Sequence, residues 1–236
     1  MRCPPPRPKD GAVNYMEPRN GEPTSPPSAG RGMGGRLIIR RLGRTDFEPT
    51  WRAMQRFTAE RTADTPDEFW LTEHPPVFTQ GQAGRPEHLL RDTGIPLVKI
   101  DRGGQITYHG PGQVVAYLLV DLSRRGLKVR DLVTRIEQAV IDLLAGHGLR
   151  GERLAGAPGV YVGGAKIAAL GLRVKGGCCY HGVALNVDME LEPYSAINPC
   201  GYPGMKVTQL RDLGVESDWV RAGEALLEQL ERQLER

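Results

Sequence analysis

Apolar side chains are scarce at the start of the chain and regularly patterned after it. Residues 1–35 contain 8 Pro and 6 Gly, and Val13 is the only Val, Leu, Ile or Phe among them. Such a segment buries too little apolar surface to offset the entropy of ordering its backbone. We therefore expect a disordered extension over residues 1–35, followed by one folded domain, the candidate catalytic domain, over residues 36–236.

Runs of apolar and β-branched residues predict the strands of this domain. The strongest run, QVVAYLLVD at residues 113–121, is apolar on both faces and is typical of a central strand. The pair Gly163-Gly164 between two apolar runs predicts a hairpin of residues 159–162 and 166–174. Further strands are expected at residues 37–41, 69–72, 96–100 and 180–187.

Helical spacing of apolar residues predicts three helices. The first begins after Thr45 or Asp46 and carries Trp51, Met54 and Phe57 on one face. The second covers residues 131–145 and stops at Gly146, and the third runs from near residue 217 to the end of the chain. Together these elements predict an α/β (α+β) fold with a mixed, mainly antiparallel sheet flanked by helices.

Composition narrows the class of protein. The 236 residues carry 31 Lys and Arg against 28 Asp and Glu, a net charge of +3, which does not favour nucleic acid as a partner. No apolar run approaches the roughly 18 residues that a membrane span requires. The four cysteines (Cys3, Cys178, Cys179 and Cys200) form no C-x-x-C pair, so we expect neither a disulfide framework nor a zinc site. These features predict a soluble, cytoplasmic protein.

Residues 102–113 form a glycine-rich segment, RGGQITYHGPGQ, between two predicted strands. Glycines let backbone N–H groups approach a ligand closely, and Arg102 and His109 are suited to bind anionic or carbonyl oxygens. The alternative is an ordinary glycine-rich connection. The segment is not a P-loop, because the G-x-x-x-x-G-K-[ST] spacing is missing.

Two further residues are candidates for chemistry. Cys200 lies in a turn-forming loop, NPCGYPG, and would act as a nucleophile only with a cation or base nearby; the alternative is a structural thiol. Lys166 begins an otherwise apolar strand. It is either a surface lysine at the strand end or the buried cation that a catalytic thiol needs.

Six motifs occur in order along residues 36–210: EHPPVFTQG (73–81), the 102–113 segment, APGVY (157–161), KIAALGLRV (166–174), HGVALNV (181–187) and NPCGY (198–202). This series resembles the lipoyl(octanoyl) transferase family, the octanoyl-carrier-protein:protein transferases. Residues 1–35 match nothing in that family.

The resemblance implies a fold like that of biotin and lipoate protein ligases. It also implies a dyad, with Cys200 as the acyl-accepting nucleophile and Lys166 as its partner. The acyl-binding segments of the family correspond to Arg102, Gly103, Gly104, Gln105, Ile106, Thr107, Tyr108 and His109, to Ala169, Leu170 and Gly171, and to Gly182, Val183 and Ala184.

The activity implied is octanoyl transfer from acyl carrier protein to a lysine of a lipoyl domain, the first step of endogenous protein lipoylation. The acceptors would be 2-oxoacid dehydrogenases and the glycine cleavage H protein, and no metal, cofactor or membrane is expected. Three alternatives are an ATP-dependent lipoate or biotin ligase, an octanoyl amidotransferase acting between proteins, and a non-catalytic carrier-binding protein. Only the first would need ATP.

A cluster of cations follows the predicted central strand. Arg124, Arg125, Lys128 and Arg130 fall within seven residues. One interpretation is a docking surface for the acidic carrier protein, which such charges would steer. The alternative is a solvated loop leading into the second helix.

Overall fold

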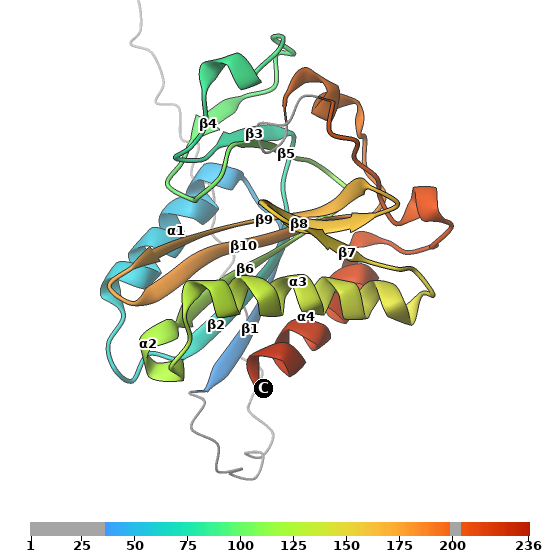
Figure 1. The fold of residues 1–236 in the computed structure, drawn as a ribbon. Coiled ribbons are helices and arrows are strands. Elements are labelled where there is room, and N and C mark those ends of the chain that lie inside the picture. The colour runs from blue at the N-terminus through green and yellow to red at the C-terminus, as the bar shows by residue number, and fades with distance from the viewer. Residues whose placement is uncertain (1–35, 199–203) are drawn as a thin grey trace, which may run out of the picture. The chain divides into compact units, whose positions relative to one another are not determined.

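The computed structural model describes residues 36–198 and 204–236. The extension predicted over residues 1–35 therefore lies outside the described residues, and so does Cys200. Ten strands and four α-helices make up the described part (Figure 1). Three short 3-10 turns lie at Pro86–His88, Glu192–Ala196 and Arg211–Leu213.

Seven strands form the main sheet, in the order β1-β2-β6-β10-β9-β8-β7. Only β1 and β2 pair in parallel, and every other pairing is antiparallel. The predicted mixed, mainly antiparallel sheet is thereby confirmed. The strands are β1 (Leu37–Arg44), β2 (Asp67–Glu73), β6 (Gln113–Asp121), β7 (Glu152–Leu154), β8 (Ala157–Val162), β9 (Ala165–Lys175) and β10 (Cys178–Asn186).

A second sheet of three strands lies at one end of the main sheet, at the top of Figure 1. Its order is β4-β3-β5, where β4 (Leu97–Lys99) pairs in parallel and β5 (Ile106–His109) antiparallel with β3 (Val77–Gln80). The sequence predicted neither β3 nor β5. The glycine-rich segment thus contains a strand as well as a loop.

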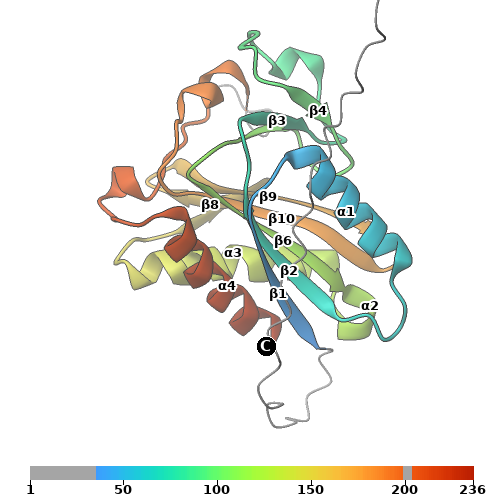
Figure 2. The same cartoon turned by 180° about the vertical axis from the view of Figure 1, so that it is seen from behind.

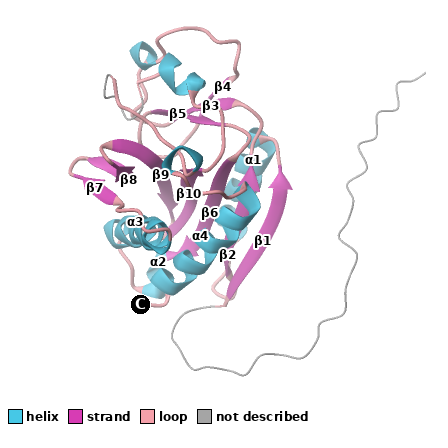
Figure 3. Ribbon diagram, turned by 90° about the vertical axis from the view of Figure 1, so that its right-hand side faces the viewer, coloured by secondary structure: helices cyan, strands magenta, loops and turns pink. Residues whose placement is uncertain are grey.

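Strand β6 occupies an interior position, as its apolar run predicted, and only its last residue is not buried. Its alternate side chains enter two different apolar layers. Val114, Ala116 and Leu118 pack toward α3 (Val129–Gly146) and α4 (Trp219–Leu234). Val115 and Tyr117 face α1 (Phe47–Glu60) on the opposite side. Figures 2 and 3 show α1 on one face of the sheet, with α3 and α4 together on the other.

The helices follow their predicted apolar faces, with small shifts at both ends of α3. In α4, Asp218 caps the first turn by accepting a hydrogen bond from the backbone of Arg221 at 2.8 Å, and Leu226, Leu227, Leu230 and Leu234 are buried. The expected stop at Gly146 is displaced, because α3 still includes Gly146. Helix α3 is followed two residues later by Gly148, whose left-handed backbone, with φ of +72°, prevents the helix from continuing.

Candidate active site

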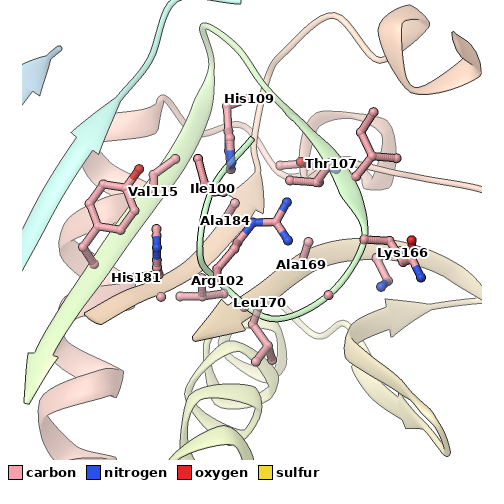
Figure 4. Close-up of a pocket in the computed structure, with 18 of the residues that line it drawn as sticks. Ile100, Arg102, Thr107, His109, Val115, Lys166, Ala169, Leu170, His181 and Ala184 are labelled. Atoms are coloured by element: carbon pink, nitrogen blue, oxygen red, sulfur yellow. The ribbon is translucent and has the colours of Figure 1, made fainter. Parts of the chain in front are cut away.

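A pocket of about 750 Å³, part of it open to solvent, lies between the main sheet and the segment that connects β4 to β5 (Figure 4). Its floor is formed by β9 and β10, and the glycine-rich segment passes over it. The lining residues are Phe47, Ile100, Arg102, Gly104, Gln105, Ile106, Thr107, His109, Val115, Tyr117, Lys166, Ala169, Leu170, Gly171, His181, Gly182, Val183, Ala184, Asn186, Tyr194 and Val207.

The structure brings most of the predicted site residues to this one pocket. Two of the predicted acyl-binding residues do not line it. Because side chains alternate along β5, the Tyr108 side chain lies on the opposite face of the strand from its two neighbours. Its ring packs between those of Phe78 and Tyr194, with a centroid distance of 5.6 Å to each. Gly103 instead donates its N–H to the carbonyl of Leu172 at 2.9 Å, which ties the glycine-rich segment to β9.

Lys166 is buried in the pocket wall, with 3% of its surface exposed, so it does not extend to solvent. Its Nζ donates to the Pro158 carbonyl at 3.0 Å and lies 5.1 Å from the centre of the Tyr161 ring. Gly159 makes this position possible. A Cβ there would lie 3.2 Å from Lys166 Cε and 2.6 Å from the Ala168 carbonyl oxygen.

The backbone of Lys166 pairs with the segment that follows the cysteine loop. Its N–H donates to the Lys206 carbonyl at 2.8 Å, and its carbonyl accepts from Thr208 N–H at 2.9 Å. Lys166 and Val207 thereby form a parallel bridge, and Val207 itself lines the pocket. The chain a few residues beyond Cys200 is therefore joined directly to the lysine.

Arg102 holds the glycine-rich segment in place over the floor of the pocket. Its Nη2 donates to the backbone oxygen of Thr79 at 2.7 Å and to its Oγ1 at 3.0 Å, and Nη1 donates to the Gly103 carbonyl at 2.9 Å. Gly171 on β9 leaves room for the side chain, since a Cβ there would lie 3.0 Å from Arg102 Cδ. A guanidinium so bound is a fixed positive charge at the centre of the pocket.

His109 is a neutral imidazole in this pocket. Burial, followed by the neighbouring His74, lowers the pKa of His109 to about 3. Its Nδ1 lies 2.7 Å from Gln113 Oε1, an acceptor, so the hydrogen-bond network assigns the proton to Nδ1. Gln113 in turn donates to Asn186 Oδ1 at 2.9 Å and to the Tyr194 hydroxyl at 3.0 Å, while its bond to His109 joins the main sheet to β5 of the second sheet.

Neither of the two cysteines of β10 is a good nucleophile. Cys178 and Cys179 do not line the pocket. Cys179 is buried, and that burial raises the pKa of its thiol to about 12. The pKa of Cys178 is also raised, mainly by burial. Both thiols therefore stay protonated at neutral pH.

Several lining residues were absent from the predicted acyl-binding set. Val115 and Tyr117 lie in a predicted strand, and side chains two positions apart share one face of a strand. The sequence did not indicate that this face borders the pocket. Phe47 comes from the first turn of α1. His181 lies in a recognised motif, but its orientation depends on a backbone conformation that no local pattern signals: its φ is +65°.

Comparisons with known proteins identify the family. Residues 46–231 match the model of the lipoyl protein ligase A/B catalytic domain. An octanoyltransferase of Aromatoleum aromaticum is 67% identical over 224 residues, which cover 95% of this chain and 94% of that protein. The chain belongs to the lipoyl protein ligase A/B family. The predicted resemblance and the assignment as a transferase enzyme are thereby confirmed.

Solved structures of proteins with much lower sequence identity have a similar fold. A putative lipoate protein ligase of Thermoplasma acidophilum with bound lipoic acid superposes with a TM-score of 0.66 at 18% identity, covering 86% of each chain. A biotin protein ligase of Aquifex aeolicus in complex with biotin and ATP gives a TM-score of 0.52 at 13% identity, covering 84% of this chain and 70% of that one. The predicted ligase-like fold is confirmed.

The basic cluster after β6 has a structural role in this member of the family. Arg124 and Arg125 bind the carboxylate of Asp67 at 2.7 and 2.5 Å, together with Arg61 at 2.6 Å. Asp67 is fully buried and the Arg125 side chain is 8% exposed. The interpretation of these two arginines as exposed docking cations is therefore wrong, because they are bound to a carboxylate 57 and 58 positions earlier in the chain.

Within residues 36–198 and 204–236, no group of three or more His, Cys, Asp or Glu side chains is placed to bind a metal ion. None of the helices described there is long and apolar enough to cross a bilayer.

Proposed function

We propose that this enzyme transfers an octanoyl group from octanoyl-acyl carrier protein to a lysine of a lipoyl domain, through a thioester on Cys200. The acceptors would be the lipoyl domains of 2-oxoacid dehydrogenases and the glycine cleavage H protein. Its relatives support the transferred group, since they are named octanoyltransferases. The observation that supports the mechanism is the position of Lys166. Its ammonium group is buried in the pocket wall, and its backbone forms a β-bridge with the segment after the cysteine loop.

The pocket suits a saturated chain. Ile100, Val115, Ala169 and Ala184 line it with apolar side chains and contribute no hydrogen-bonding side-chain group. Burial of each methylene contributes about 0.8 kcal/mol, so six methylenes contribute about 5 kcal/mol. That energy would hold an octanoyl chain while its carbonyl carbon reacts.

In the first step, the Cys200 thiolate attacks the carbonyl carbon of the donor thioester. The new C–S bond forms as the carrier's C–S bond breaks, and the carrier leaves as a thiolate that takes up a proton. The Lys166 ammonium favours the reactive state, because a nearby cation lowers a thiol pKa below its usual value of about 8.5. One thioester replaces another, so this step requires no ATP.

In the second step, the lysine amine of the lipoyl domain attacks the acyl-Cys200. The amine must first lose a proton, since its usual pKa is about 10.4. Lys166 can accept that proton after giving its own to the departing thiolate. His109 is a poorer base, because its pKa of about 3 leaves it little affinity for a proton. The amide forms as the C–S bond breaks, and Cys200 is regenerated.

The test uses intact-mass measurement without ATP. Octanoyl-carrier protein alone should add one octanoyl group to the enzyme, and a lipoyl domain added afterwards should take it up. Cys200→Ser should abolish the adduct, while the matched Cys178→Ser variant should retain it. An adduct that maps to Cys178 or Cys179, or transfer that requires ATP, contradicts the proposal and favours a ligase.

A second measurement separates the two roles of Lys166. In Lys166→Ala the thiol should lose its stabilising cation, so its alkylation by iodoacetamide at pH 7 should slow and should recover toward pH 9. Lys166→Arg keeps the charge but does not release a proton in this range. That variant should alkylate faster than the alanine variant and still transfer poorly. An unchanged alkylation profile in Lys166→Ala would remove Lys166 as the activating partner.

A further inference from the structure

Glu137 is a buried carboxylate near the middle of α3 that has no part in the two steps above. It has 7% of its surface exposed, and it does not line the pocket. Its Oε1 accepts a hydrogen bond from the backbone N–H of Gly159 at 3.0 Å, and its Oε2 accepts from Arg153 Nε at 3.0 Å. A helix side chain thus binds the backbone of β8 in the main sheet.

The pairing of β7 with β8 explains why this N–H needs a side-chain acceptor. The two strands pair on both sides of Arg153, but residues 158–160 of β8 lie opposite this one residue of β7. Residues in such a bulge lack regular partners in the ladder. A buried backbone N–H without an acceptor is costly, and the Glu137 carboxylate supplies the acceptor. The Arg153 side chain in turn holds the carboxylate from β7.

The same peptide group contacts Lys166 on its other side. The carbonyl of Pro158 and the N–H of Gly159 belong to one planar unit, and in a trans peptide they point in opposite directions. With the N–H bound to Glu137, the carbonyl is directed at Lys166 Nζ, which donates to it at 3.0 Å. The carboxylate on α3 is therefore connected to the ammonium in the pocket wall through a single peptide group.

The orientation of this peptide is not fixed by Gly159 itself. Glycine lacks the Cβ that restricts φ in other residues, and the φ of Gly159 is +135°. A rotation of the peptide plane would turn the N–H, instead of the carbonyl, toward the Lys166 ammonium. The bond to Glu137 opposes this rotation, because the N–H would then lose the carboxylate. That bond also makes the carbonyl a better acceptor, since hydrogen bonds through one peptide polarise each other.

We propose that Glu137 is a positioning residue, which holds the peptide between Pro158 and Gly159 with its carbonyl toward Lys166 and thereby keeps the ammonium in place. The inference rests on the proposed function and adds to it a residue outside the pocket. Because Glu137 does not line the pocket, its effect reaches the reacting groups through the peptide and Lys166. Loss of the carboxylate should therefore change the rate of the chemical step and leave donor binding unchanged.

The experiment measures single-turnover acylation of the enzyme by octanoyl-carrier protein, followed by intact mass. Glu137→Met fills a similar volume without an acceptor and releases the peptide. Acylation should then slow by at least about tenfold, since misplacement of a reacting group by about 1 Å costs roughly 100-fold. The donor concentration that gives half the maximal rate should not change. Glu137→Gln keeps an oxygen for the Gly159 N–H and should retain most of the rate. Glu137→Asp keeps the charge but is one methylene too short, so it should be as slow as Glu137→Met.

Two readouts separate positioning from a general loss of stability. Alkylation of Cys200 by iodoacetamide at pH 7 should slow in Glu137→Met and recover toward pH 9, as expected for Lys166→Ala. Adding Glu137→Met to Lys166→Ala should slow alkylation no further, because the two residues act by one route. Asp142→Asn is the matched control. Asp142 is another carboxylate of α3, which accepts from Gln233 Nε2 at 2.7 Å and lies outside the pocket lining, so this variant should acylate at the original rate.

The outcomes distinguish the two proposals. If the unmodified enzyme takes up no octanoyl group from carrier protein, the proposed function fails. If it does, and folded Glu137→Met or Glu137→Asp acylates at the original rate, only the inference about Glu137 is overturned. Equal slowing by Asp142→Asn, or a Glu137→Gln enzyme as slow as Glu137→Met, would overturn it too. So would further slowing of alkylation in the double variant, because Glu137 would then act by a route other than Lys166.

Discussion

The position of Lys166 depends on the absence of a side chain at Gly159, which Gly159→Ala tests. Gly159 has φ of +135°, a region that alanine adopts only at a cost of about 1–3 kcal/mol. The added Cβ would lie 2.6 Å from the Ala168 carbonyl oxygen, and relief of such an overlap costs about 1–3 kcal/mol more. We expect the free energy of unfolding to fall by about 2–6 kcal/mol in urea titrations.

The same Cβ would lie 3.2 Å from Lys166 Cε and 3.3 Å from its Nζ, so the ammonium must move. Misplacement of a reacting group by about 1 Å costs roughly 100-fold in rate, so a shift of a few tenths of an ångström should lower octanoyl transfer several-fold. Gly164→Ala is the matched control in the adjoining turn. Gly164 also has positive φ, +79°, but a Cβ there meets nothing within 4 Å.

The control should therefore lose only about 1–2 kcal/mol, from backbone strain, and should transfer octanoyl at the original rate. Equal losses of stability in the two variants would refute the close packing of Gly159 against β9. Unchanged transfer by a folded Gly159→Ala enzyme would refute the requirement for Lys166 at this position.

Three further predictions concern the rest of the chain. Asp67→Asn should lower the unfolding free energy by about 3–5 kcal/mol, because three arginines lose their shared carboxylate; a loss below 1 kcal/mol in urea titration would contradict this. Since the pKa of folded His109 is lowered, only the unfolded chain takes up its proton below about pH 6.5. The free energy of unfolding should therefore decrease as the pH is lowered from about 6.5 to about 3, by up to about 1.4 kcal/mol per pH unit from this residue. His109→Gln should reduce that slope. Deletion of residues 1–35 should leave the melting temperature and the transfer rate unchanged, whereas a drop of several degrees would show that this segment is structural.

Elements whose apolar pattern is strong and local were predictable from the sequence. Strand β6 was predicted with its observed bounds, and the β8–β9 hairpin followed from Gly163-Gly164. Three short strands, β3, β5 and β7, were not. The three residues of β7 are all exposed, and β3 forms its sheet with two strands that come later in the chain. Strands of three or four residues are too short to carry a clear periodic pattern.

The site was predictable where its residues lie in contiguous motifs. Arg102, His109 and Lys166 belong to such motifs, and all three line the pocket. The role of Asp67 was not predictable, because it depends on donors from other elements. Arg124 and Arg125 were interpreted as docking cations, but their charges are compensated by Asp67, a residue more than 50 positions earlier in the chain. Sequence spacing alone does not reveal such compensation.

The separation of the two apolar layers bears on how this enzyme can be engineered. No residue of α3 or α4 is among those that line the pocket, although both helices pack on the sheet that forms its floor. Better packing or capping of those two helices should raise stability while the acyl-binding surface stays as it is. A protein strengthened in this way would remain folded with strained or truncated side chains in its pocket. Altered acyl preference could then be selected in variants that would otherwise unfold.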